Sequence, residues 1–136
     1  MSASFTRLVV HCVWSTSNRR PILDERRSAR VYGLLARLCA DHRCAPLAIG
    51  GTADHVHVLV GLHPSLAVAD LVRRLKVGTS QFVSHHLGVP DFAWQNGYGA
   101  FSLRAEDTER LRGYVLGQAQ HHANHTAVDE WERAVP

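Results

Sequence analysis

The sequence predicts a small α+β domain in which strands and helices alternate along the chain. Three observations support this class: short segments rich in β-branched residues, longer segments whose apolar residues recur at helical spacing, and turn residues between them. The chain has 136 residues, of which 46% are hydrophobic and 20% are charged. Because this length suits one hydrophobic core, we expect residues 1–136 to form a single domain.

The first half of the chain is expected to contain three strands and one helix. Residues 5–15 form the first predicted strand, and a turn at residues 18–21 follows it. Residues 24–42 carry apolar side chains at helical spacing behind an acidic start, which predicts a long helix. Two short strands joined by a tight turn are predicted at residues 45–51 and 55–62.

The second half is expected to contain a helix, a strand and a further helix. Ser65 can cap a helix that runs to about His86. The stretch 93–103 mixes aromatic residues with glycines and predicts a strand, and a last helix covers about residues 106–122 or slightly more. The order βαββαβ is the ferredoxin-like pattern, an antiparallel sheet with two helices on one face. Here an extra C-terminal helix carries Tyr114.

Composition narrows the class of protein. No segment approaches the ~18 uninterrupted apolar residues of a membrane span, and the N-terminus lacks the features of a signal peptide. We therefore expect a soluble, cytoplasmic protein.

The three cysteines, Cys12, Cys39 and Cys44, form an odd set without a CxxC pair and are expected to be reduced and mostly buried. The net charge of +3 permits a nucleic-acid partner without proving one.

Two residue pairs point to a reactive site. His55 and His57 are two apart on a predicted strand, so their imidazoles share a face and can bind one metal ion. Tyr114 and Gln118 are four apart on a predicted helix and share a face in the same way. Taken alone, a His-x-His pair is more often packed or on the surface than a metal site, and a helical tyrosine is usually part of a packed face. The joint arrangement is what indicates a site.

Several motifs follow one another in a fixed order. They are residues 49–60 (IGGTADHVHVLV), 94–102 (WQNGYGAFS) and 114–122 (YVLGQAQHH), with an opening segment at residues 11–21. In these motifs the chain resembles the single-tyrosine HUH transposases of bacterial insertion sequences, a family that includes IS200-like transposases and the REP-associated tyrosine transposases. The likeness extends over about residues 6–131.

The resemblance implies a function and a set of site residues. His55 and His57 would bind a metal ion with Gln118 as third ligand, and Tyr114 would be the nucleophile. The implied activity is DNA transposition, in which single-stranded DNA is cleaved and rejoined through a 5′-phosphotyrosine intermediate. The implied substrate is DNA hairpins at the ends of a mobile element. A homodimer is also implied, whose tyrosine helices can complete the partner's active site in trans.

The metal is predicted from the chemistry of these ligands. Two imidazoles and an amide oxygen suit Mn²⁺ and other transition ions, whereas Mg²⁺ prefers all-oxygen shells. We expect Mg²⁺ or Mn²⁺ in the cell according to availability, and Zn²⁺ can also bind in vitro.

Residue type alone suggests DNA contacts. Clustered basic residues can follow phosphates, and aromatic residues can stack on unpaired bases. The candidates are Arg19, Arg20, Arg73, Arg74 and Lys76 for phosphates, and Trp94 and Tyr98 for bases. Solvated helix faces and core packing are the alternative explanations for these residues.

The sequence is compatible with three functions. The first is an active transposase, and the second is a relative of the same fold that binds or processes repeated palindromic DNA without mobilising itself. The third is a metal-dependent hydrolase or a ferredoxin-like binding module in which the histidines are incidental. Gly113 and Gly117 beside the tyrosine weaken its helix, which favours either a helix that moves between active sites or one that packs closely on the sheet.

Overall fold

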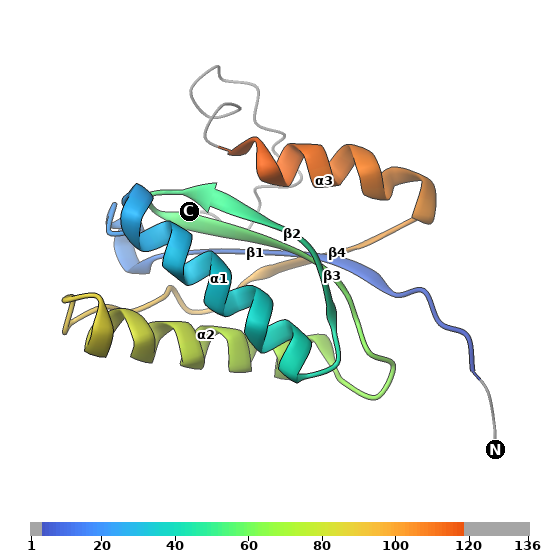
Figure 1. Ribbon diagram of the computed structural model, residues 1–136, viewed down its shortest axis with the longest axis horizontal. Coiled ribbons are helices and arrows are strands. Elements are labelled where there is room, and N and C mark those ends of the chain that lie inside the picture. Colours follow the sequence, from blue (N-terminus) through green and yellow to red (C-terminus); the bar gives the residue numbers. More distant parts are fainter. Residues whose placement is uncertain (1–3, 119–136) are drawn as a thin grey trace.

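The computed structural model describes residues 4–118 (Figure 1). They form the predicted βαββαβ order followed by one more helix. The elements are β1 (Val9–Ser15), η1 (Ser17–Arg19), α1 (Glu25–Asp41), β2 (Ala45–Thr52), β3 (His55–Gly61), α2 (Val68–His86), β4 (Gly99–Leu103), η2 (Ala105–Asp107) and α3 (Thr108–Leu116), where η marks a short 3₁₀ helix. None of the described helices is long and apolar enough to span a membrane.

The four strands form one antiparallel sheet in the order β2-β3-β1-β4. Helices α1 and α2 lie on one face of this sheet, and α3 lies on the other (Figure 1). The α+β class, the antiparallel sheet and the pair of helices on one face are therefore confirmed. Because helices cover both faces, the central strands β1 and β3 are buried along almost their whole length.

The larger core lies between the sheet and helices α1 and α2. Every second residue of the central strands points into it, as strand geometry requires. These residues are Val10, Cys12 and Trp14 of β1 and Val56, Val58 and Val60 of β3. They pack against buried leucines of the helices, among them Leu35 of α1 and Leu75 of α2. The intervening residues of both strands consequently face α3.

The three cysteines are free and buried, as expected. Burial raises the pKa of Cys12 to about 12, with a smaller contribution from Cys39. Burial also raises the pKa of Cys39 to about 12, with a smaller contribution from Cys44. The thiols of Cys12 and Cys39 therefore stay protonated and unreactive at neutral pH.

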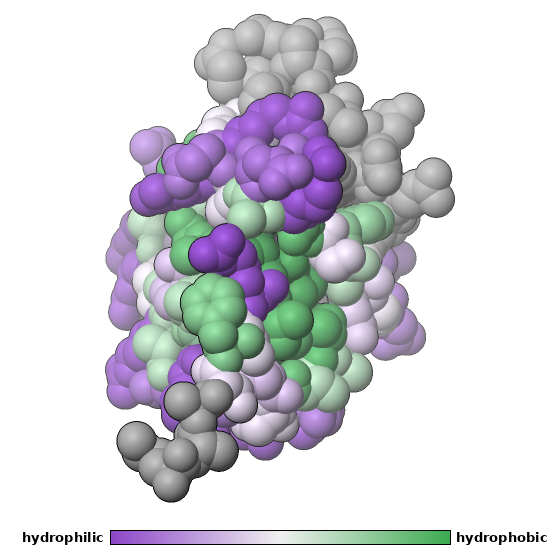
Figure 2. Space-filling view, turned by 90° about the vertical axis from the view of Figure 1, so that its right-hand side faces the viewer, coloured by the Kyte–Doolittle hydropathy of each residue, from purple (hydrophilic) through white to green (hydrophobic). Residues whose placement is uncertain are grey.

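Helix α3 packs on the second face through a small apolar cluster. Leu111, Tyr114 and Val115 of α3 contact residues of the sheet that include Ala48 and Leu59. The polar side chains at the start of α3 face outward, above an apolar surface of the sheet (Figure 2). The helix is thus amphipathic and is held mainly by its apolar side.

A glycine of the sheet permits this close packing. A Cβ atom at Gly50 of β2 would overlap the carbonyl oxygen of Val115, so α3 approaches this strand more closely than any side chain allows. Among residues 4–118, in contrast, no atom lies within 4 Å of the place where a Cβ atom of Gly113 in α3 would be. The interpretation that Gly113 packs the helix against the sheet is therefore wrong, because the close contact is made through the strand glycine.

Element boundaries differ from the prediction in three places. Helix α2 begins at Val68, and Ser65 does not cap it, because the Ser65 hydroxyl lies 2.7 Å from Nδ1 of His63. Strand β1 begins at Val9 instead of residue 5, and β4 covers Gly99–Leu103 alone. The predicted end of the last helix, near residue 122, lies outside the described residues.

Candidate functional site

The two histidines of β3 lie side by side on the face of the sheet that α3 covers. His55 and His57 are both fully buried. Their ring centroids are 5.1 Å apart, and the ring planes meet at 68°. The spacing of two residues along a strand produces this arrangement, as predicted.

Hydrogen bonds at both ends of the ring orient His55. Its Nδ1 atom lies 2.8 Å from Oδ1 of Asp54 and 2.8 Å from Oγ1 of Thr52. Its Nε2 atom lies 3.2 Å from Oε1 of Gln118. Histidines that bind metal through one ring nitrogen are usually oriented by a carboxylate or another polar group at the other. Asp54 and Thr52 are placed to do this for His55.

Asp54 remains ionised because its neighbours favour the carboxylate. Burial raises its pKa, but hydrogen bonds from His55, Arg19 and Thr52 and the charge of Arg19 outweigh burial, so the pKa lies below its usual value. The Nη2 atom of Arg19 lies 3.1 Å from Oδ2 of Asp54. Arg19 has a left-handed φ of 52°, uncommon for a residue with a side chain. An Arg19–Asp54–His55 chain therefore runs from the turn after β1 to the site.

A third histidine orients His57. The Nε2 atom of His11 on β1 lies 2.7 Å from Nδ1 of His57, and the two rings stack with centroids 5.0 Å apart at 14°. His11 is also fully buried. Each histidine of the pair thus makes a hydrogen bond through its Nδ1 atom to a group placed behind it.

Helix α3 brings Tyr114 and Gln118 to the same place. The Tyr114 ring meets His57 edge-on, with centroids 6.0 Å apart and planes at 77°, and Tyr114 is 5% exposed. Gln118 is 1% exposed, and its Nε2 atom donates to the backbone oxygen of Tyr114 at 3.4 Å. The structure therefore unites His55, His57, Tyr114 and Gln118 within one chain.

The donor atoms of this cluster fit a metal ion. Within residues 4–118, no group of three or more His, Cys, Asp or Glu side chains could hold one. A metal here would rely on two imidazoles and the amide oxygen of Gln118, with water or substrate as the remaining ligands. Such a mixed nitrogen and oxygen set suits transition ions such as Mn²⁺.

A comparison with known protein families assigns the chain to one of them. The family described as "Transposase IS200 like" matches residues 4–118. The chain belongs to this family. No curated protein sequence matches it.

Two solved structures share the fold of this IS200-like transposase. One is the crystal structure of a protein from Deinococcus radiodurans described as a transposase, with a TM-score of 0.68, 20% identity and coverage of 94% of this chain and 98% of that one. The other is a REP-associated tyrosine transposase bound to a REP hairpin, with a TM-score of 0.65, 14% identity and coverage of 93% and 74%.

The basic residues predicted to follow phosphates are mostly engaged within the transposase. Lys76 donates from Nζ to the backbone oxygens of Gln95 at 2.7 Å and Gly97 at 2.9 Å, and burial lowers its pKa. Arg19 holds Asp54, and Arg20 forms an exposed ion pair with Asp91 at 3.2 Å. Lys76 and Arg19 thus have structural partners that compete with any phosphate.

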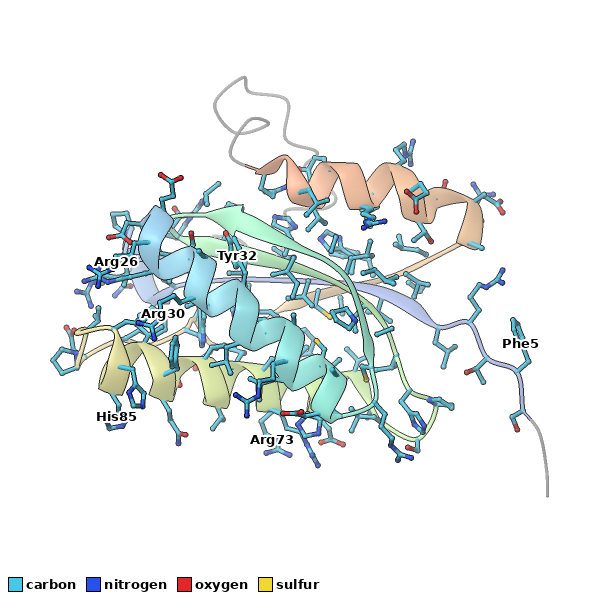
Figure 3. All side chains as sticks on the ribbon, viewed as in Figure 1. Phe5, Arg26, Arg30, Tyr32, Arg73 and His85 are labelled. Atoms are coloured by element: carbon cyan, nitrogen blue, oxygen red, sulfur yellow. The ribbon has the colours of Figure 1, made fainter. Side chains whose placement is uncertain are left out.

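Two other basic candidates lie on α2, far from the tyrosine. Arg73 lies on the side of the sheet that α1 and α2 cover, opposite α3 (Figure 3). Its partner is Asp70, 3.8 Å away, while Nη1 of Arg74 lies 3.1 Å from Nδ1 of His42. A phosphate bound to Arg73 would therefore lie across the sheet from the candidate site.

The two aromatic candidates differ in accessibility. Trp94 is 8% exposed, donates from Nε1 to Oγ1 of Thr79 and meets Trp14 edge-on. Its ring belongs to the core and cannot stack on a base, so this prediction is wrong. Tyr98 is 38% exposed and borders a groove of about 320 Å³ that Arg73 also lines. Tyr98 remains a candidate for base stacking.

Sequence reasoning missed His11 and Asp54 as parts of the site. Asp54 directly precedes His55, so adjacency was an available signal for it. His11 carries no comparable signal, because its contact with His57 depends on how β1 and β3 pair in this transposase.

Proposed function

We propose that the chain is a transposase that cleaves and rejoins single-stranded DNA through Tyr114. The observation that carries this proposal is the edge-on contact of the Tyr114 ring with His57, in the same buried cluster as His55 and Gln118. A phenol beside a metal-binding donor set is suited to attack a phosphodiester, because both the nucleophile and the charge-neutralising group act on one phosphate.

Tyr114 would form and then break a covalent link to DNA. Its phenolic oxygen attacks the phosphorus and loses its proton, while the bond from phosphorus to the 3′ oxygen breaks and that oxygen leaves as a hydroxyl. A second 3′ hydroxyl later attacks the phosphotyrosine, and Tyr114 regains its proton. Each step exchanges one phosphoester bond for another, so no ATP is needed.

A divalent metal, Mg²⁺ or Mn²⁺, would be held by His55, His57 and Gln118. When bound, it supplies the positive charge that neutralises the scissile phosphate and stabilises the leaving 3′ oxygen. Asp54 and His11 keep the two imidazoles in position through their hydrogen bonds.

We further propose that the substrate is a DNA hairpin at the end of a mobile element, acted on by a homodimer in the cytoplasm. The relative whose structure contains a REP hairpin supports this substrate class. Tyr114 reaches His57 of its own chain. In a dimer, the same helix could serve the partner's site if α3 left this contact.

A second candidate function uses the same residues. The likeness to the REP-associated transposase favours a relative that binds or processes palindromic repeats without mobilising itself. Flanking DNA distinguishes the two: hairpins that bracket the gene support a mobile element, and scattered palindromes elsewhere support the second function.

The decisive experiment is a search for the covalent adduct. The protein is incubated with Mn²⁺ and labelled single-stranded DNA from the ends of its own locus, then run on a denaturing gel. We expect a slowly migrating adduct that is lost in Tyr114→Phe. Tyr32→Phe is the matched control, because Tyr32 lies on α1, across the sheet from the site. Strand cleavage without an adduct would indicate a hydrolase instead.

A further inference from the structure

The backbone N–H, the backbone oxygen and the side-chain oxygen of Gln95 all form hydrogen bonds. Its backbone N–H donates to the oxygen of Ser15 at 2.9 Å, and its backbone oxygen accepts from Nζ of Lys76 at 2.7 Å. Its side-chain Oε1 accepts from the Ser15 N–H at 2.5 Å and from the Ser15 hydroxyl at 2.7 Å. The side chain is therefore fixed before any ligand arrives.

These contacts decide which way the amide points. A backbone N–H can only donate, so the Gln95 atom that faces Ser15 must be the oxygen. The NH₂ group then lies at the other end of the amide. Within residues 4–118, no hydrogen bond of this NH₂ group is found, although Gln95 is partly buried.

The amide is bound to Ser15 of β1, and the candidate metal ligand His55 lies on the neighbouring strand β3. Ser15 is directly opposite His55 in the antiparallel pairing of β1 and β3, and paired residues share a face of the sheet. Gln95 also lines an open pocket of about 510 Å³ at this end of β1, together with Ser17, Asn18, Arg19 and Asn96. Arg19 connects the wall of this pocket to His55 through Asp54.

We propose that the side-chain NH₂ of Gln95 binds a phosphate oxygen of single-stranded DNA, at the linkage next to the scissile one. The inference rests on the proposed function, since it extends the same site along the DNA strand. A fixed donor is suited to a phosphate oxygen, which accepts hydrogen bonds and does not donate them. The alternative is that Gln95 merely ties residues 93–95 to the end of β1.

Gln95→Glu separates these roles. Glutamate keeps an oxygen for both Ser15 donors, but it replaces the NH₂ group with a negatively charged acceptor. A purely structural role predicts unchanged DNA binding. We expect the Kd for single-stranded DNA, measured by fluorescence anisotropy, to rise by about tenfold or more, as loss of a hydrogen bond to a charged group implies.

The matched control is Gln81→Glu, which adds the same charge on the exposed side of α2. It should leave DNA affinity unchanged. The melting temperature and the Mn²⁺ affinity of Gln95→Glu are measured alongside and should match the wild-type values. Wild-type DNA affinity in Gln95→Glu, or an equal loss in Gln81→Glu, would overturn the proposal.

Modified DNA tests whether the bound group is a phosphate or a base. A neutral methylphosphonate at the linkage next to the cleavage site should weaken wild-type binding and remove most of the difference between wild type and Gln95→Glu. If an abasic nucleotide removes that difference instead, the phosphate assignment is wrong. In the same preparation, the wild-type Tyr114 adduct reports on the proposed function separately: its presence with an unaffected Gln95→Glu variant would refute this inference alone.

Discussion

The Nε2 atom of His11 lies 2.7 Å from Nδ1 of His57, so a histidine on one central strand orients a candidate metal ligand on the next. If a metal binds His57 through Nε2, the Nδ1 proton points at His11 as acceptor. This arrangement matches the way metal-binding histidines are generally supported.

Replacing His11 should therefore weaken metal binding without removing a ligand. His11→Phe preserves an aromatic ring for stacking but loses the hydrogen bond, and we expect Mn²⁺ affinity to fall by about 10- to 100-fold. His11→Gln, which offers an amide oxygen as acceptor, should recover part of the loss. Calorimetric titration with Mn²⁺ measures both. Equal affinity in His11→Phe and wild type would show that His11 does not support the ligand.

Asp54→Asn should also weaken Mn²⁺ binding. The substitution removes the charge that pairs with Arg19 and the strongest acceptor for His55. We expect a loss of affinity in the same range of about 10- to 100-fold. The control is Asp91→Asn, because Asp91 forms an exposed ion pair with Arg20 away from the histidines. A similar loss in both variants would point to a general effect of charge.

Substitutions at two glycines should have different consequences, one for adduct formation and the other for stability. Gly50→Ala places a methyl group against the Val115 carbonyl, so α3 must shift and the Tyr114 adduct should decrease strongly. Gly113→Ala adds a methyl group that no atom of residues 4–118 obstructs, and it should raise the free energy of unfolding by about 1 kcal/mol. Chemical denaturation and the adduct gel measure these changes. Normal adduct formation in Gly50→Ala would mean that the position of α3 is less restricted than its packing indicates.

The weakness of the tyrosine helix can be tested separately. If Gly113 and Gly117 let α3 move between active sites, replacing both with alanine should slow strand exchange more than the first cleavage. Single-turnover rates of adduct formation and of strand joining give the comparison. Equal slowing of the two steps would rule out a moving helix.

The buried thiols should react only when the protein unfolds. Because burial raises the pKa of Cys12 and Cys39 to about 12, iodoacetamide at neutral pH should leave both unmodified in the native protein and label them in denaturant. Mass spectrometry after short labelling times reads this directly. Labelling of either residue at the rate of the unfolded chain would contradict their burial.

The same pKa shifts predict how stability depends on pH. The folded protein keeps these thiol protons above the ordinary thiol pKa of about 8.5, whereas the unfolded chain releases them. The free energy of unfolding should therefore fall as the pH rises from about 8.5 toward 12, and Cys12→Ala should show a smaller fall. Denaturant titrations at several alkaline pH values provide the measurement.

Local periodicity was enough to predict the order of the elements and the two residue pairs of the site. His55 and His57 share a face because they are two apart on a strand, and Tyr114 and Gln118 because they are four apart on a helix. These relationships depend on neighbours in the chain, so they are visible without the fold. The Ser65 cap was wrong because its hydroxyl engages His63 instead.

The tertiary structure decided everything that depends on residues distant in the chain. Strand pairing brought His11 to His57, and the turn after β1 brought Arg19 to Asp54. Core packing buried Trp94, which its sequence neighbourhood left open as a base-stacking residue. By itself the sequence determined which side chains share a face of an element. The tertiary structure determined which of these faces contact one another. Each such contact gains its free energy from two elements packed in a particular register, so neither element alone can specify it.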